Sequence, residues 1–482
     1  MFDLRLVLYI VGIMVVTLGG TMLLPALVDL VLGNQDWQVF TISATVTVFI
    51  GGSLMLTNRT SNGGQWRARE AVLMTNLAWL MLSIFGALPL HLSELDLSYT
   101  DAFFEAVSGL TTTGSTVMVG LDDAPPGILL WRSILQWLGG IGIIVMAISV
   151  LPMLAIGGMQ LFQMEAFESD KVLPRTAQLA SSIGLLYIAL TLLCIICYGL
   201  AGMGTFDAVT HALTTISTGG FATSDNSMGI FDSAIIDAIT ITFMILGCLP
   251  FVLMIVAIRG GWMKLIMDRQ VQWFIGILFS AIGTMTLYTW VYVYQDLGKA
   301  LRYSAFNVTS VMTGTGYASA DYGTWGAFPL TVFFFLMFIG GCAGSTTCAI
   351  KVFRFQILYA VTKTQLQKLL QPHGVFIPYY NRRPVPEDVP LAVMSFFAMF
   401  GLSFGILAIA LGLMGLDFLT AISGAATAIS NVGPGLGNII GPAGNFKPLP
   451  DAAKWVLSFG MLLGRLELFT VLVLLLPQFW RR

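Results

Sequence analysis

The sequence predicts an all-α integral membrane protein with four pseudo-symmetric helix–pore-loop–helix repeats around one central pore. An N-terminal two-helix hairpin precedes the repeats and brings the total to ten spans. Three observations predict this fold: the composition, the number of long apolar stretches, and four related glycine turns. Of 482 residues, 56% are apolar and only 10% are charged, and the mean hydropathy is +0.84. Soluble domains carry about 25% charged residues, so this chain belongs in a membrane.

The apolar stretches set the number of spans, because a helix needs about 20 apolar residues to cross a bilayer. The first stretch is longer than the roughly 7–15-residue core of a signal peptide, so we expect it to remain as an anchor. Ten stretches place both chain ends on one side of the membrane. They lie near residues 5–32, 36–57, 70–92, 125–158, 180–201, 233–258, 272–295, 327–350, 390–413 and 452–478.

The charges predict how the chain is oriented. Most of the 23 Lys and Arg fall on the side that carries Arg5, which is therefore cytoplasmic by the positive-inside rule. Acidic residues gather on the opposite side, where they either concentrate cations or serve only as polar loop residues. They are Glu94, Asp96, Asp122, Asp123, Asp225, Asp232 and Asp321. A net charge of −2 offers no basic surface, so we expect no nucleic-acid partner.

Four short turns between apolar segments align on a glycine, and we name them filter loops 1 to 4. The aligned glycines are Gly114, Gly220, Gly316 and Gly433, spaced by 106, 96 and 117 residues. Six residues before each glycine stands a hydroxyl residue, and four and eight residues before it stand apolar ones. Such long intervals indicate a fourfold duplication of one unit. The loops cover residues 108–115, 214–221, 310–317 and 427–434.

Each unit contains a short helix of about 10–13 residues before its filter loop, too short to span the membrane. These helices begin near Asp101, Asp207, Tyr303 and Thr420, and we expect Asp101 and Asp207 to be N-caps. The filter loops cannot face lipid, since unpaired backbone groups cost several kcal/mol there. Glycine allows positive φ, and rings of backbone carbonyls can replace the hydration shell of potassium. Glu105 and His211, nine residues before their glycines, should hold the short helices to their neighbours.

The predicted divisions of the chain follow these repeats. The longest polar connector, residues 352–389, is either a cytoplasmic docking surface or a solvated linker. The divisions are the N-terminal hairpin at 1–69, repeat 1 at 70–158, a connector and repeat 2 at 159–259, repeat 3 at 260–351, the cytoplasmic connector at 352–389 and repeat 4 at 390–482.

Together these features resemble one family. Four pore-loop repeats in one chain, one glycine per filter, two extra N-terminal helices and the fourth turn Asn431-Val-Gly-Pro-Gly-Leu-Gly437 are similar to the bacterial Trk branch of the Trk/Ktr/HKT potassium transporters. In plant relatives a serine at the first filter glycine accompanies sodium permeation, and this chain has Gly114 there. The resemblance implies K⁺ bound by Thr111, Thr112, Thr113, Gly114, Thr218, Gly219, Gly220, Thr315, Gly316, Asn431, Val432 and Gly433.

A run of small and hydroxyl residues interrupts the helix after filter loop 3, and we call residues 340–347 the small-residue loop. Each glycine weakens a helix by about 1 kcal/mol relative to alanine, so a break is expected here. Close helix packing is the alternative interpretation. The resemblance implies an intramembrane gate formed by Gly340, Gly341, Ala343, Gly344, Ser345, Thr346 and Thr347, together with Arg465.

Arg465 stands near the middle of the last apolar stretch. A charge at that depth costs several kcal/mol unless it faces a cavity or a partner. The resemblance implies a position beside the gate, and pairing with Glu467 is the alternative.

The resemblance further implies partners, a location and a function. We expect a multi-pass protein of the bacterial inner membrane, a homodimer in contact with lipid, that takes up potassium. A cytoplasmic nucleotide-binding regulatory subunit, a TrkA-like ring, would dock on it, so nucleotide is expected only on that partner and no cofactor beyond pore K⁺ is expected here. No HExxH or GxSxG motif suggests an enzyme. Proton- or sodium-coupled symport stays open, as does a secondary transporter of another fold, whose halves would have opposite topology.

Overall fold

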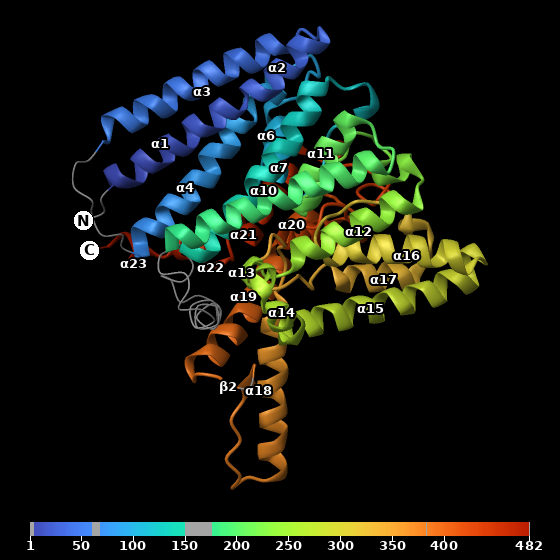
Figure 1. Cartoon of the computed structure of the whole chain (residues 1–482). Helices are drawn as coiled ribbons and strands as arrows, with labels where there is room; N and C mark the ends of the chain where they lie inside the picture. Colours follow the sequence, from blue (N-terminus) through green and yellow to red (C-terminus); the bar gives the residue numbers. More distant parts are fainter. Residues whose placement is uncertain (1–3, 60–67, 150–175, 382, 482) are drawn as a thin grey trace.

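The computed structural model describes residues 4–59, 68–149, 176–381 and 383–481, and these are mainly helical (Figure 1). The predicted boundary between repeats 1 and 2, at residues 158 and 159, lies outside the described residues, as does the end of the fourth apolar stretch. Over the described part, two short strands, β1 (Tyr379–Tyr380) and β2 (Arg383–Pro384), form an antiparallel pair.

The N-terminal helices pack as a hairpin against the rest of the chain. Helices α1 (Leu4–Thr21) and α2 (Leu23–Leu32) run one after the other, and α3 (Trp37–Thr57) returns beside α1 (Figure 1). Gly12 and Gly51 permit this approach, because a Cβ on Gly12 would lie 2.8 Å from Gly51 O. The Asp29 carboxylate of α2 accepts a 2.7 Å hydrogen bond from Gly127 N at the start of α7 (Pro126–Ser149), which ties the hairpin to the remaining helices.

Four helices of 12 to 16 residues each end in a filter loop and lie between a preceding and a following helix. They are α6 (Tyr99–Leu110), α11 (Thr205–Ile216), α16 (Leu297–Met312) and α20 (Phe418–Ser430). The preceding helices are α4 (Ala68–Gly86), α10 (Thr176–Leu200), α15 (Arg269–Thr289) and α19 (Asp388–Leu413). The following helices are α7 (Pro126–Ser149), α12 (Ala234–Cys248), α17 (Ala327–Leu336) and α21 (Asp451–Arg465). The same order of elements therefore occurs four times.

The N-caps of the short helices lie earlier than the sequence suggested, by three residues in α6, α11 and α20 and by seven in α16. The cap residues are Ser98, Gly204, Asp296 and Asp417, so the expectation that Asp101 and Asp207 are caps was wrong. Helix α6 begins earlier because Ser98 Oγ accepts from Asp101 N at 3.1 Å, which caps the helix at Ser98. Bonds from the Thr420 hydroxyl and amide hold the pKa of the Asp417 carboxyl below its ordinary value.

Seven helices in the described residues are long and apolar enough to cross a membrane, or nine if each bent pair counts as one span. The protein is therefore a multi-pass membrane protein. The eighth predicted stretch holds only the ten-residue α17 before the chain leaves the helix. The total of ten spans stays a prediction.

Within the described residues, helix breaks follow filter loops 2, 3 and 4. The expected break after α17 runs from Met337 to Lys351, where α18 (Val352–Leu370) follows. Two other breaks were missed: α12 bends by 103° into α13 (Phe251–Val256), and α21 bends by 110° into α22 (Phe469–Leu472). Pro250 explains the first, because proline lacks an amide donor. Arg465 therefore ends a helix, and the expectation that it sits within a continuous one was wrong.

The remaining elements lie at the edges of the molecule. Helix α18 and the strands β1 and β2 extend below the helical body, away from the filter loops (Figure 1). The predicted connector 352–389 thus contains a 19-residue helix. Three shorter helices complete the described chain: α5 (Leu88–Leu92), α14 (Trp262–Met267) and α23 (Pro477–Trp480).

Candidate functional site

The four filter loops share one backbone conformation. In each loop the aligned glycine and the residue two before it have positive φ. The pairs are Thr112 (51°) with Gly114 (84°), Thr218 (51°) with Gly220 (78°), Gly314 (69°) with Gly316 (81°), and Asn431 (54°) with Gly433 (112°). In each loop the backbone amide of the residue just before the aligned glycine also donates a hydrogen bond to the backbone carbonyl of the residue five positions before that amide. These bonds are Thr113 to Ser108 at 2.8 Å, Gly219 to Thr214 at 2.8 Å, Thr315 to Ser310 at 2.9 Å, and Val432 to Thr427 at 3.1 Å.

The loops meet in a closed ring. A Cβ on Gly114 would lie 2.2 Å from Gly219 O, and one on Gly220 would lie 1.7 Å from Thr315 O. One on Gly316 would lie 2.1 Å from Val432 O, and one on Gly433 would lie 2.9 Å from Thr113 O. Each loop thus places the carbonyl before its glycine against the glycine of another loop, in the order 1, 2, 3, 4 and back to 1. Glycine is required at these positions by both φ and space.

Side-chain hydroxyls of the loops are used to hold the backbone. The Thr111 and Thr113 hydroxyls lie 2.7 Å apart, as do those of Thr313 and Thr315. Thr427 Oγ1 donates to Gly433 O at 3.0 Å. Within this hydroxyl column Ser108 Oγ is buried without a hydrogen-bond partner. In the hydroxyl column predicted from the sequence, Ser310 and Thr427 therefore support their own loops, since Ser310 Oγ also donates to Tyr317 O at 2.7 Å.

Hydrogen bonds also join one loop to another. Asn431 Nδ2 donates to Thr113 Oγ1 at 2.8 Å, and Ser115 Oγ donates to Gly433 O at 2.6 Å. The Thr214 hydroxyl bonds the Tyr317 hydroxyl between loops 2 and 3. Loops 4 and 1, and loops 2 and 3, are therefore linked by side chains as well as by the ring.

A hollow of about 260 Å³ opens over the ring. Its lining includes Gly114, Gly220, Gly316 and Pro434, so every filter loop reaches it. Of the acidic residues expected at the outer mouth, Asp225 lines this hollow. Its carboxylate accepts from Gly120 N at 2.8 Å and Leu121 N at 3.2 Å, which fixes the negative charge beside the entrance.

The small-residue loop lies directly against filter loop 2. Thr218 Oγ1 donates to Thr346 Oγ1 at 3.1 Å, and Thr346 N and Oγ1 both donate to Gly247 O. A parallel bridge between Ile339 and Ile350 joins the ends of the loop, so the chain enters and leaves it in the same direction. A Cβ on Gly340 would lie 2.1 Å from Cys348 O, so glycine allows the two sides to meet. The residues predicted to form a gate are therefore brought next to the predicted filter.

Arg465 holds the small-residue loop from the other side. Its guanidinium donates to Thr346 O at 3.1 Å and to Gly139 O at 2.8 Å. The position at the last residue of α21 adds the favourable field of a helix C-terminus. The alternative partner Glu467 bonds Arg354 at 2.6 Å instead. Arg465 thus lies 1% exposed beside the predicted gate.

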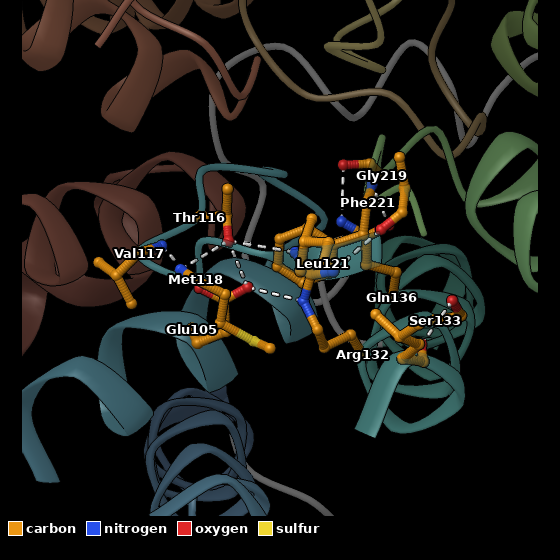
Figure 2. Close-up of polar contacts among 12 residues, drawn as sticks. Glu105, Thr116, Val117, Met118, Leu121, Arg132, Ser133, Gln136, Gly219 and Phe221 are labelled. Carbon is orange, nitrogen blue, oxygen red and sulfur yellow. Dashed lines mark hydrogen bonds and ion pairs between the residues drawn. The ribbon is translucent and has the colours of Figure 1, made fainter. Parts of the chain in front are cut away.

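Sequence reasoning missed a buried ion pair behind filter loop 1, shown in Figure 2. Glu105 of α6 accepts from Arg132 Nε of α7 at 2.8 Å, and the two side chains are 0% and 1% exposed. Glu105 also accepts from Val117 N at 2.9 Å, so it joins its short helix to neighbouring segments as expected. The sequence did contain a signal for this ion pair. Arg132 is a charged residue inside the fourth apolar stretch, and a charge at that depth requires a partner.

Removing the Glu105 charge should strongly destabilise the protein. Glu105→Gln leaves the Arg132 cation buried without its counter-ion, which costs about 3–5 kcal/mol. We expect a clearly lower melting temperature in detergent. Asp232→Asn is the control, because Asp232 forms a 3.1 Å pair with Arg302 but is 75% exposed. Equal melting temperatures for the two variants would contradict the expectation.

Comparisons with known proteins agree with this architecture. A family model described as TrkH, cation transport protein, matches residues 36–481. The Trk system potassium uptake protein TrkI of Halomonas elongata is 45% identical over 478 residues, covering 99% of this chain and 97% of that protein. The Trk system potassium uptake protein TrkH of Escherichia coli K12 is 38% identical, covering 99% of each chain. The crystal structure of the potassium transporter TrkH from Vibrio parahaemolyticus matches with a TM-score of 0.91 at 37% identity, covering 99% of this chain and 100% of that one.

Proposed function

This chain belongs to the TrkH family of cation transport proteins, and we propose that it takes up potassium across the bacterial inner membrane through the ring of filter loops. The observation that carries this proposal is the closed ring, in which four loops with the same pattern of positive φ meet through their glycines and carbonyls. The assignment of potassium as the transported ion rests on the names of the relatives and on the family resemblance.

Selection would take place on backbone oxygens. Ordered carbonyls can replace the water that a potassium ion loses on entry. The short helices α6, α11, α16 and α20 run directly into their loops, so their partially negative C-terminal ends lie beside the ring and favour a cation there. Two of the expected ligands also accept from side chains: Gly219 O from Gln136, and Gly433 O from Ser115 and Thr427.

Gating would take place at the small-residue loop and Arg465. The loop lies against filter loop 2, and the Arg465 cation beside it repels other cations by Coulomb interaction in a medium of low dielectric constant. Helix α18 begins immediately after this segment, so movement of α18 would be transmitted to the loop. We expect a cytoplasmic nucleotide-binding regulatory subunit to act through α18, and two copies of the chain to form a homodimer.

Cation flux into liposomes tests the proposal. The purified chain, reconstituted alone, should admit K⁺ and Rb⁺ well above Na⁺ under an imposed membrane potential without a proton gradient. Flux that appears only with a pH or sodium gradient would support coupled symport instead. Equal entry of Na⁺ and K⁺ would overturn the selective pore.

A further inference from the structure

Filter loop 2 contains two successive glycines, Gly219 and Gly220, at its tip. Glycine loses more backbone entropy on ordering than any other residue. Gly220 needs its freedom, since its φ is 78°. Gly219 is not among the described residues with positive φ, so its backbone conformation would accept a side chain. Another feature must explain the glycine at 219.

The side chain of Gln136 supplies that explanation. A Cβ on Gly219 would lie 2.4 Å from both Cδ and Oε1 of Gln136, so this amide occupies the space of a side chain at 219. Gln136 Nε2 donates to Gly219 O at 2.6 Å, and Gln136 Oε1 accepts from Phe221 N at 3.0 Å. A single buried amide therefore holds filter loop 2 on both sides of Gly220 (Figure 2).

Arg132 supports the same loop one turn earlier on α7. Residues four apart share a helix face. Arg132 donates to Ala222 O at 3.0 Å and lies 4.1 Å from the centre of the Phe221 ring. Glu105 fixes the guanidinium and also bonds the segment after filter loop 1. Helix α7, which follows filter loop 1, thus fixes filter loop 2.

Repeats 2 and 4 have a different residue at the place of Gln136. One glycine in each of α7, α12 and α21 contacts the carbonyl four residues before the filter glycine of its own repeat. A Cβ at this glycine would meet that carbonyl: Gly139 meets Leu110 O, Gly247 meets Ile216 O, and Gly464 meets Ile429 O. Three residues before these glycines stand Gln136, Met244 and Met461. Repeat 1 therefore has an amide at a place where repeats 2 and 4 have methionine.

From these contacts we propose that Gln136 is a positioning residue for ion selectivity, which orients the Gly219 carbonyl in the ring, and that Arg132, held by Glu105, supports the same loop. The inference rests on the proposed function, since it concerns the ions that the ring selects. The Gly219 carbonyl touches Gly114 of filter loop 1, so a shift of filter loop 2 would widen the ring where repeats 1 and 2 meet.

Gln136→Met tests the inference with the side chain that repeats 2 and 4 already hold at this place. The variant should fold, and its ratio of Rb⁺ to Na⁺ influx in liposomes should fall about tenfold, the effect of losing hydrogen bonds of ordinary buried strength. Ser133→Ala is the matched control on α7, because Ser133 Oγ bonds only its own helix at Leu129 O. This control should keep the ratio of the unchanged protein.

Gly219→Ala is the second variant, which reaches the same contact from the loop. Its Cβ displaces the Gln136 amide, so selectivity should fall here too. In a Gln136→Ala background the space is free, and adding Gly219→Ala should cause little further loss, because the two residues share one contact.

The outcomes separate the two proposals. If the unchanged protein prefers Rb⁺ over Na⁺ and both Gln136→Met and Gly219→Ala keep that ratio, the role of Gln136 is overturned and the proposed function stands. A uniform fall of all fluxes with an unchanged ratio also overturns it, since that is the effect of a purely structural residue. If the unchanged protein shows no preference, the proposed function fails and the inference falls with it.

Discussion

Gly316→Ser should abolish most of the preference for potassium over sodium while leaving a cation pathway. The new Cβ would lie 2.1 Å from Val432 O, so filter loops 3 and 4 must move apart. The φ of 81° adds strain for any residue other than glycine, about 1–3 kcal/mol. At about 1.4 kcal/mol per tenfold, a loss of tenfold or more in the ratio of Rb⁺ to Na⁺ influx is expected.

Two control variants distinguish a change in the geometry of the ring from a general effect of replacing a glycine by serine. Gly283→Ser lies in α15, where a Cβ would meet nothing within 4 Å, and it should leave the flux ratio unchanged. Gly314→Ser also has positive φ, but its nearest neighbour, Asn431 O, is 3.3 Å away, so an intermediate loss is expected. A full K⁺ preference in Gly316→Ser would exclude the ring as the selective element.

Arg465→Ala should raise cation flux. The substitution removes a buried cation and the hydrogen bonds to Thr346 O and Gly139 O that hold the small-residue loop beside the filter. Both the electrostatic barrier and the obstruction would weaken. Influx of Rb⁺ in liposomes measures the effect, and the Rb⁺ to Na⁺ ratio should stay near its original value because the ring is not altered.

A conservative variant distinguishes charge from mechanical hold. Arg465→Lys keeps the positive charge but cannot donate to both carbonyls in the same geometry. Low flux in Arg465→Lys would assign the barrier to charge, and raised flux would assign it to the hydrogen bonds. Deletion of the small-residue loop should also raise flux. If neither Arg465→Ala nor the deletion changes flux, these residues do not form the gate.

Part of the site was predictable because its determinants are local in the chain. The glycine and hydroxyl columns identified the filter loops, and the structure gives all four the same positive-φ pattern. The small-residue run predicted the break after α17, since several weak helix formers lie together there. The prediction that Asp101 and Asp207 are N-caps was wrong, because an acid in the first turn of a helix resembles a cap in the sequence. The caps stand three residues earlier, at Ser98 and Gly204.

The sequence by itself determined the membrane class, the filter loops and the charge that needed a partner, because hydropathy, backbone freedom and desolvation cost are properties of short segments. Only the tertiary structure decided which groups meet. Gly114 faces Gly219 O, Arg465 bonds Gly139 O, and Gln136 fills the space beside Gly219, all across long separations in the chain. The bend after Arg465 is likewise tertiary, since no proline or glycine stands at Leu466–Leu468 and only the surrounding contacts can offset the positive φ of Glu467 and Leu468.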